Sequence, residues 1–282
     1  MKKTGLITAE IIKRLKDIGV KAQKSLGQNF LVNEGVYQKI IAAAQIKPTD
    51  TIIEVGPGLG ILTEHLANAA GRLIAVEKDR RLARYLRKKF QNNPRVEIVE
   101  SDILKFTPRH YSLQTTHYKL AGNLPYYLTS RLLKTALEEW PLPHLAVFML
   151  QKEVAQRIVA KPPHMSLLAV SVQYFSEPEI ISYVSKGSFY PVPKVDSAIV
   201  RLMTKDQGLK PKTEREKFFK VVKAGFAGKR KQLVNNLATV FKIPKAETEK
   251  KLLAAGIAPS RRAETLNLAE WAKLAKILAK SA

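Results

Sequence analysis

The chain has 282 residues, of which 45% are hydrophobic, so it can bury a substantial core and is not expected to be disordered. Its 48 Lys and Arg residues outnumber its 24 Asp and Glu residues, and the formal charge of +24 indicates a polyanionic partner, first of all nucleic acid. The absence of cysteine excludes disulfide bonds, thiolate metal sites and thiol nucleophiles.

The N-terminal segment is expected to form a short amphipathic helix over the first ~20 residues, with Ile7, Ile11, Leu15 and Ile18 along one side. Charged residues such as Glu10 interrupt the apolar run that a secretory signal or a membrane span requires. The sequence therefore predicts a cytoplasmic protein without a membrane segment.

Patterns typical of strands and helices alternate along most of the chain, after a first predicted helix near residues 36–44. Short apolar runs predict strands at 51–55, 73–76, 96–99, 118–121, 145–150, 180–184 and 198–203. Further helices are expected at 61–69, 82–90, 131–139 and 154–160. Such alternation is typical of an α/β fold, in which helices cover both faces of a mainly parallel sheet.

The character of the sequence changes after Thr204, where strand patterns stop and residues 206–211 have the composition of a linker. Helices are then expected at 218–226, 233–241, 252–255 and 268–278. Residues 206–282 hold 18 Lys and Arg against 7 Asp and Glu, a denser positive charge than in residues 1–205. We therefore expect a larger domain at 1–205 and a smaller, basic, all-α domain at 206–282.

A glycine-rich turn, EVGPGLG from Glu54 to Gly60, separates the strand at 51–55 from the helix at 61–69. Glycines let the backbone turn sharply and approach a ligand closely, although a purely structural turn also requires them. The spacing is G-x-G-x-G and not the G-x-G-x-x-G of dinucleotide-binding turns, which disfavours an NAD-linked dehydrogenase.

Two acidic residues follow the next predicted strands. Glu77 ends the second strand, where its carboxylate can accept hydrogen bonds from both hydroxyls of a ribose, and Asp102 ends the third, beside the place of an attached adenine. Either acid alone can be a solvated strand-end charge or a helix cap. In this order, together with the glycine turn, they predict a nucleoside pocket.

The motif Asn123-Leu124-Pro125-Tyr126 ends the fourth strand and points to chemistry on adenine. The exocyclic amino nitrogen of adenine is a poor nucleophile because its lone pair is delocalised into the ring. The Asn123 side-chain oxygen and the Leu124 carbonyl can accept its two hydrogens, Pro125 fixes the backbone between them, and Tyr126 offers a ring for a flipped-out base. An Asn-Leu-Pro turn with a surface tyrosine is the alternative.

With these motifs the chain resembles the ribosomal RNA adenine dimethyltransferase family over nearly its whole length. The resemblance is carried by four segments, which are Leu26–Leu31 (LGQNFL), Glu54–Gly60, Asn123–Tyr126 and Phe189–Ser197 (FYPVPKVDS). It implies a Rossmann-like class I methyltransferase sheet in residues 1–205, an RNA-binding role for residues 206–282 and S-adenosylmethionine as cofactor.

The resemblance also implies individual roles. It assigns cofactor binding to Asn29, Leu31, Gly56, Glu77, Asp102 and Asn123, and catalysis to Asn123, Leu124, Pro125 and Tyr126. It places Phe189 opposite Tyr126 at the target base. The implied reaction dimethylates two adjacent adenines of small-subunit ribosomal RNA in the immature small subunit, needs no metal, and is carried out by a monomer.

The C-terminal domain departs from the family at one point. The family carries Phe-x-x-Arg-Arg-Lys, whereas Phe226 is followed by Lys229, Arg230 and Lys231, so a phosphate contact there is favoured over a bidentate base contact. The segment 260–264 (SRRAE) also matches the family, as an RNA contact or as a helix-capping turn.

Three alternatives remain at this stage. A large-subunit rRNA methyltransferase of antibiotic resistance is disfavoured by residues 26–29, by the Asn123-Leu124 form of the motif and by the long basic C-terminal segment. A DNA adenine methyltransferase generally has Pro at the position of Leu124. A ribosome-assembly factor whose main task is binding is compatible with the same residues.

Overall fold

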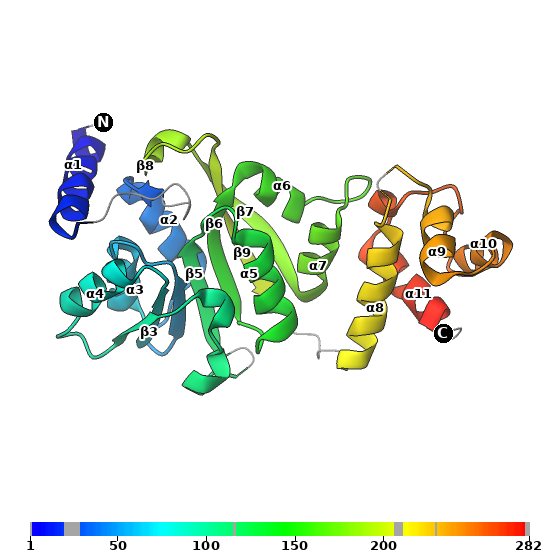
Figure 1. The fold of residues 1–282 in the computed structure, drawn as a ribbon, viewed down its shortest axis with the longest axis horizontal. Coiled ribbons are helices and arrows are strands. Elements are labelled where there is room, and N and C mark those ends of the chain that lie inside the picture. The colour runs from blue at the N-terminus through cyan, green and yellow to red at the C-terminus, as the bar shows by residue number, and fades with distance from the viewer. Residues whose placement is uncertain (1, 20–28, 115–116, 206–210, 229, 280–282) are drawn as a thin grey trace. The chain divides into compact units, whose positions relative to one another are not determined.

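The computed structural model describes residues 2–19, 29–114, 117–205, 211–228 and 230–279 (Figure 1). Contacts divide the chain into two compact units. The first unit comprises Met1–Ala155 and Glu177–Thr204, and the second comprises Gln156–Ser176 and Lys205–Ala282. The sequence-based boundary at 205 falls at one of these junctions, whereas residues 156–176, which that boundary assigns to the first domain, group with the C-terminal helices.

A seven-stranded sheet forms the centre of the first unit, in the order β4-β3-β2-β5-β6-β9-β7. Its strands are β2 (Thr51–Val55), β3 (Arg72–Glu77), β4 (Val96–Glu100), β5 (Tyr118–Asn123), β6 (Leu145–Gln151), β7 (Ser176–Val184) and β9 (Ser197–Thr204). Strands β4, β3, β2, β5 and β6 run parallel, and β9 pairs antiparallel with β6. The α/β fold with a mainly parallel sheet is thus confirmed.

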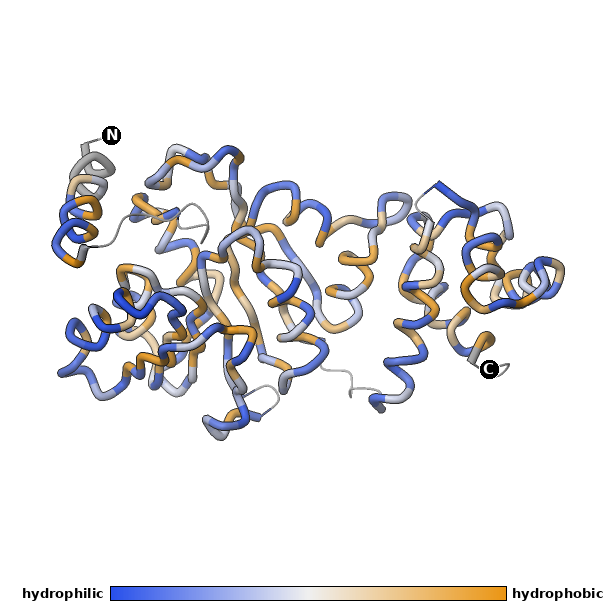
Figure 2. The backbone as a smooth tube through the Cα atoms, viewed as in Figure 1, coloured by the Kyte–Doolittle hydropathy of each residue, from blue (hydrophilic) through white to orange (hydrophobic). Residues whose placement is uncertain are grey.

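The central strands β2, β3, β5 and β6 are almost entirely buried because most of their residues are apolar, as parallel strands covered on both faces require. Figure 2 shows this apolar character along the central strands and the hydrophilic character of α4 (Arg80–Lys89). The helices of this unit are α1 (Lys2–Asp17), α2 (Glu34–Ala44), α3 (Ile61–Ala69), α4, α5 (Thr129–Lys134) and α6 (Lys152–Ile158), the last of which reaches the junction at residue 155.

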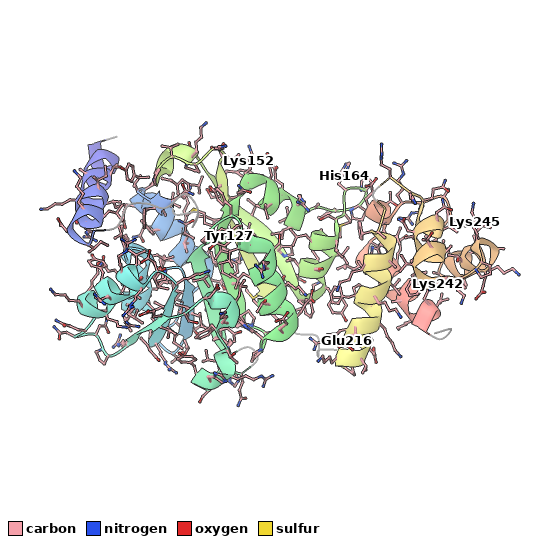
Figure 3. The ribbon with its side chains drawn as sticks, in the orientation of Figure 1. Tyr127, Lys152, His164, Glu216, Lys242 and Lys245 are labelled. Carbon is pink, nitrogen blue, oxygen red and sulfur yellow. The ribbon has the colours of Figure 1, made fainter. Side chains whose placement is uncertain are left out.

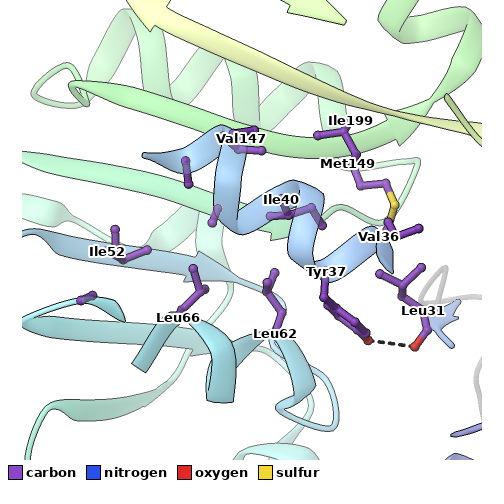
Figure 4. Close-up of a cluster of buried hydrophobic side chains, with 14 of the residues drawn as sticks. Leu31, Val36, Tyr37, Ile40, Ile52, Leu62, Leu66, Val147, Met149 and Ile199 are labelled. Carbon is purple, nitrogen blue, oxygen red and sulfur yellow. Dashed lines mark hydrogen bonds between the residues drawn. The ribbon is translucent and has the colours of Figure 1, made fainter. Parts of the chain in front are cut away.

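One core cluster joins α2 and α3 to the sheet (Figure 4). Ile40 of α2 and Leu66 of α3 pack with Ile52 and Val147 of the strands, and all four are fully buried. Burying an aliphatic side chain of this size contributes roughly 1.5–3 kcal/mol before the entropy cost of ordering it. This packing holds the carboxyl ends of β2 and β5, where the motifs lie, in a fixed relation.

A two-stranded sheet lies outside the main one. The strand β1 (Phe30–Leu31) pairs antiparallel with β8 (Phe189–Tyr190), so two of the family-like segments lie side by side. The N-terminal helix α1, expected from its amphipathic pattern, buries Ile11 and Leu15 in a cluster that contains Leu59 and Leu82.

The second unit is helical apart from its short connections. It contains α7 (Leu167–Phe175), α8 (Lys212–Gly225), α9 (Leu233–Phe241), α10 (Lys245–Ala254) and α11 (Leu268–Ala279). Trp271 of α11 is fully buried, and α8 contacts α7, α9 and α11. The predicted C-terminal helices are confirmed, although α10 begins seven residues before residue 252 and α7 was not expected.

Two further observations concern the helices. The helix expected at 131–139 is α-helical only to Lys134 and continues as a π-helical turn at Thr135–Glu139. Within the described parts of the chain, no helix combines the length and the apolar character that crossing a membrane demands.

Candidate functional site

The glycine turn between β2 and α3 adopts a conformation that other residues avoid. Gly56, Gly58 and Gly60 have φ angles of 66°, 60° and 73°, all in the left-handed region. A Cβ atom on Gly60 would also lie 2.6 Å from Leu86 Cδ2 of α4, whereas a Cβ on Gly56 would meet nothing within 4 Å. The turn therefore packs closely against α4 on one side and leaves open space at Gly56.

A second glycine brings β5 against this turn. A Cβ atom on Gly122 would lie 2.6 Å from the Val55 carbonyl oxygen, so only glycine permits this approach of the two strands. Asn123 follows immediately, at the carboxyl end of β5. The sheet thus places Asn123 beside the glycine turn, although the two are more than 60 residues apart in the chain.

These segments line one cavity at the carboxyl edge of the sheet, where open α/β sheets bind their ligands. Its wall comes from β1 and the residue before it, the glycine turn, the ends of β2 and β3, and the segment after β5. The lining residues are Asn29, Phe30, Leu31, Tyr37, Glu54, Gly56, Pro57, Gly58, Leu59, Ile61, Leu62, Glu77, Leu82, Asn123, Leu124, Pro125, Tyr126 and Tyr127. Eight sequence-predicted site residues therefore meet here, namely Asn29, Leu31, Gly56, Glu77, Asn123, Leu124, Pro125 and Tyr126.

Glu77 is held in place by the backbone. Its Oε2 accepts a hydrogen bond from Gly58 N at 3.1 Å, and its Oε1 accepts one from Asp79 N at 2.8 Å. Burial raises the pKa of the Glu77 carboxyl, and these two backbone N–H groups oppose that shift. The Lys78 backbone N–H also lowers this pKa. Because a carboxylate can accept about four hydrogen bonds, acceptor capacity remains for a ligand such as a ribose diol.

Glu54 is a second buried acid of the cavity. Its side chain is 1% exposed, and its Oε2 has no hydrogen-bond partner among the described residues. Burial, with a smaller contribution from the nearby Glu77 carboxylate, raises the pKa of Glu54 to about 8. A buried carboxylate without a partner is costly, so this oxygen is expected to take a donor or a cation from a ligand.

The amide of Asn123 has a defined orientation. Its Nδ2 donates to the Asn29 carbonyl oxygen at 2.9 Å, which leaves Oδ1 as the acceptor that the side chain can present. The next residue, Leu124, is fixed through its backbone, since Leu124 N donates to the Met149 carbonyl oxygen of β6 at 3.2 Å. Asn29 thus has a part in positioning Asn123.

Two tyrosines of the cavity are held by their hydroxyl groups. Tyr37 is buried and donates to the Leu31 carbonyl oxygen at 2.8 Å, which ties β1 to α2 (Figure 4). Tyr126 is half-buried, and its hydroxyl lies 3.2 Å from Ser197 Oγ of β9. Burial raises the pKa of both hydroxyls, so both are neutral near pH 7.

Two sequence-predicted site residues do not line this cavity. Asp102 forms an ion pair with Lys78 at 2.8 Å and caps the short helix at Ile103–Lys105 by accepting from Leu104 N. The hydrogen bonds from Lys78 and Leu104 N lower the pKa of Asp102 against the opposing effect of burial, which is the larger single influence. Phe189 is 3% exposed and belongs to the core cluster of α2 and α3, because β8 turns its side chain inward.

The cavity also contains residues that sequence reasoning did not single out as ligands, namely Glu54, Tyr37 and Tyr127. Tyr127, labelled in Figure 3, lines the cavity and is 53% exposed. Glu54 is the first residue of the glycine motif. An acid within an otherwise apolar strand is unusual, and this feature could have identified Glu54 as a candidate ligand from the sequence. Tyr37 looks like an ordinary core residue of α2 and gives no such signal.

Some residues of the C-terminal motifs have partners within the protein, and others are exposed. Arg261 pairs with Glu270 and also donates to Thr265, which favours the capping role considered for residues 260–264. Arg230 and Lys231 are exposed, whereas Lys229 lies outside the described residues. Among the described residues, no group of His, Cys, Asp or Glu could hold a metal ion.

Comparison with known proteins assigns the chain to a family. The model of the family described as ribosomal RNA adenine dimethylase matches residues 19–280. A protein of Dehalococcoides mccartyi named ribosomal RNA small subunit methyltransferase A is 46% identical over 95% of this chain and 92% of its own length. The chain belongs to the ribosomal RNA adenine dimethylase family. A relative with the same name from Listeria innocua is 39% identical over 96% of this chain and 95% of its own length.

Solved structures agree with this family. A dimethyladenosine transferase from Plasmodium falciparum is 27% identical, with a TM-score of 0.75 over 89% of this chain and 98% of that one. The 23S rRNA methyltransferase ErmE is 30% identical, with a TM-score of 0.72 over 89% of this chain and all of that one. The expected class I methyltransferase fold is thereby confirmed.

Proposed function

We propose that this chain transfers methyl groups from S-adenosylmethionine to the exocyclic amino groups of two adjacent adenines in small-subunit ribosomal RNA, giving dimethyladenosines. Membership of the ribosomal RNA adenine dimethylase family supports the reaction. The names of the curated relatives support the small subunit as the source of the RNA. The observation that carries the proposal is the cavity in which the glycine turn and two buried acids meet Asn123.

The residues of the cavity fit S-adenosylmethionine. This cofactor has a ribose diol and two cationic groups, a sulfonium and an ammonium. The free acceptor positions of Glu77 suit the diol, and the unpartnered Oε2 of Glu54 suits a cation. The open space at Gly56 lets a ligand reach the backbone of the turn, and Asn29 and Leu31 close the other side.

The carboxylate of Asp102 is engaged by Lys78 and lies outside the cavity lining. We infer that Asp102 contacts the cofactor only if Lys78 releases it, and that Tyr127 supplies the exposed aromatic surface at this end of the cavity. The ring of Phe189 is buried in the core and does not face the target base. We infer that Phe189 affects the base only by holding β8 in position.

The protein aligns the reacting groups and supplies hydrogen-bond acceptors for the target amino group. The cofactor supplies an activated methyl group, so no metal and no covalent enzyme intermediate are needed. Asn123 Oδ1, whose direction is set by the Asn29 carbonyl, accepts one hydrogen of the adenine amino group, and the Leu124 carbonyl accepts the other. These two acceptors reduce the delocalisation of the nitrogen lone pair and align it for in-line attack.

The ring of Tyr126 provides a surface on which a flipped-out adenine stacks, and its hydroxyl contact with Ser197 restricts the ring. The dimethyl product requires the monomethylated base to rebind with its methyl group turned aside.

We further propose that the basic helical part at 206–282 binds the RNA, that the immature small subunit is the natural substrate, and that the enzyme is a cytoplasmic monomer.

The proposal is tested by incubating the protein with methyl-labelled S-adenosylmethionine and immature small subunits, followed by mapping of the modified nucleotides. We expect label at two adjacent adenines. The Asn123→Ala variant should lose the label by a factor of 100 or more, roughly the contribution of a positioned polar group, while RNA binding persists.

A matched control is Asn93→Ala, which alters an asparagine in the turn before β4, away from the cavity lining. Label in a base other than adenine, or none with the parent protein, would contradict the proposal. Loss of RNA binding in the folded Asn123→Ala variant would assign a structural role to the motif instead.

A further inference from the structure

Helix α4 carries an unusual concentration of positive charge on the catalytic unit. Six of its ten residues are Arg or Lys, and its first turn contains no acid apart from the capping Asp79. Basic residues in the first turn oppose the helix dipole, and like charges four residues apart destabilise a helix. Such a helix is expected to have an anionic partner that offsets the repulsion.

The basic residues of α4 fall into two groups. Arg81, Arg87 and Lys89 have partners within the chain, namely the Gly19 carbonyl oxygen at 2.9 Å, Glu100 at 3.0 Å and Glu64 at 2.8 Å. The other three, Arg80, Arg84 and Lys88, are exposed, and none of the ion pairs or hydrogen bonds among the described residues uses their side chains. Their spacing of four residues corresponds to about 6 Å along the helix per step.

These charges border a groove with an aromatic residue in it. The groove is lined by Ile18, Arg81, Arg84, Tyr85, Lys88 and Lys89. Tyr85 and Ile18 pack on the cluster that holds α1 against the catalytic unit, so the groove has an apolar floor and cationic sides. A cationic groove with an aromatic side chain is the pattern that binds single-stranded nucleic acid, through phosphates and through stacking of a base.

The groove is separate from the cofactor cavity. Leu82 and Leu86 of α4 are buried, and Leu82 lines the cavity, whereas Tyr85, Arg84 and Lys88 lie on another side of the helix. The helix begins three residues after Glu77, which lines the cavity. Of the three exposed residues, Arg80 is nearest to Glu77 in the chain, and Arg84 and Lys88 follow along α4.

We propose that α4 and the groove beside Ile18 bind a single-stranded segment of the substrate RNA, with phosphates on Arg80, Arg84 and Lys88 and a base against Tyr85. The proposal rests on the proposed function, since that function supplies the RNA. Residues 20–28, which follow Gly19, contain Lys21 and Lys24 and no acid, so their charge does not complement this groove.

The test compares two double variants that remove the same charge. Arg84→Gln with Lys88→Gln neutralises the groove, and Lys47→Gln with Arg95→Gln neutralises two exposed residues at the amino-terminal edge of the same sheet. Binding of a short single-stranded oligoadenylate and of small-subunit RNA is measured by fluorescence anisotropy at several salt concentrations. The parent protein's methylation of saturating RNA is measured in parallel, so that failure of the proposed function is detected independently.

We expect the groove variant to lower the log–log salt slope by about 1.4–1.8, which is about 0.7–0.9 for each of two phosphate contacts, while the control variant keeps the parent slope. Tyr85→Ser should weaken binding roughly five- to 150-fold at an unchanged slope, and Tyr85→Phe should restore it. Equal slopes for the groove variant and the parent would overturn the proposal. A loss of binding to anionic lipid vesicles without loss of RNA binding would also overturn it, by assigning the groove to a membrane surface.

Discussion

At the scale of single residues, the site depends on groups whose partners lie far away in the chain. The hydrogen bond from Asn123 Nδ2 to the Asn29 carbonyl oxygen joins residues 94 positions apart. It decides which atom of the amide can accept a hydrogen bond from a substrate. The sequence names both residues through the family resemblance, but only the structure shows that one orients the other.

Glu54 yields a prediction about stability and pH. Its folded pKa of about 8 lies above the ordinary value of 4.5. Its contribution to stability is therefore fully present below pH 4.5 and is lost as the pH rises towards 8. In the absence of cofactor, the free energy of unfolding of the parent should fall relative to that of Glu54→Gln across this window, by at most about 1.4 kcal/mol per pH unit.

Urea unfolding at several pH values measures this difference. Glu153→Gln, which changes an exposed carboxylate of α6, is the control and should leave the pH dependence of the parent unchanged. A stability difference between parent and Glu54→Gln that does not vary with pH would show that Glu54 is ionised in the folded state throughout.

At the scale of elements, the glycine turn and α4 depend on each other. Gly56→Ala and Gly60→Ala both force a side chain into the left-handed region, but only the Cβ on Gly60 meets Leu86 at 2.6 Å. We expect Gly56→Ala to cost roughly 1 kcal/mol of stability and Gly60→Ala roughly 1–3 kcal/mol more. Thermal unfolding without cofactor compares the two variants directly. Equal losses of stability would mean that Leu86 of α4 moves away from the added Cβ atom without a measurable cost.

Most elements could be predicted because their periodicity is strong. The strand at 145–150 is uniformly apolar, the strand at 51–55 is apolar apart from Thr51 and Glu54, and the helix at 61–69 lies where the pattern places it. Helix α7 was missed because eight of the nine residues of LLAVSVQYF are apolar, aromatic or small, which leaves no clear polar face to mark a helix. The inward position of Phe189 was missed for a related reason, since a strand of two residues has no period.

At the scale of the whole molecule, the chain leaves the catalytic unit after Ala155 and re-enters it at Glu177. The segment between these residues contains α7. The rings of Tyr174 and Phe175 in α7 contact Phe219 of α8 at centroid distances of 5.1 Å and 5.8 Å. A chain that ends at Thr204 would therefore expose the aromatic face of α7. The domain boundary at 205, which looks natural in the sequence, cuts through a packed group of rings.

We expect the fragment 1–204 to bind a hydrophobic dye and to aggregate at concentrations at which the full chain stays dispersed. Light scattering and dye fluorescence measure both effects. A fragment in which Tyr174 and Phe175 are also replaced by Ser and Gln should aggregate less, which separates exposure of α7 from general unfolding. A dispersed fragment 1–204 that does not bind the dye would show that α7 is covered without α8.

The basic C-terminal turn can be tested at the same scale. Asn236 is buried and donates to the Gly225 and Gly228 carbonyl oxygens at 2.7 Å and 3.0 Å, which ties the end of α8 and Gly228 to α9. If Arg230 and Lys231 both bind phosphate, replacing them by Gln should lower the salt slope of RNA binding by about 1.4–1.8. Lys242→Gln with Lys245→Gln is the matched control in the same unit. A parent-like slope in the Arg230 and Lys231 variant would identify an ordinary solvated turn.

The pairing of β1 with β8 has a consequence for the order in which the protein is made. The glycine turn, Glu77 and Asn123 all leave the ribosome before Phe189 and Tyr190 have been added. Phe30 and Leu31, the first strand residues to emerge, must wait for the partner strand that fixes them over the cavity. Most residues of the proposed methyl-donor site are thus synthesised early, whereas the partner strand of β1 is added only near the end of the catalytic unit's synthesis.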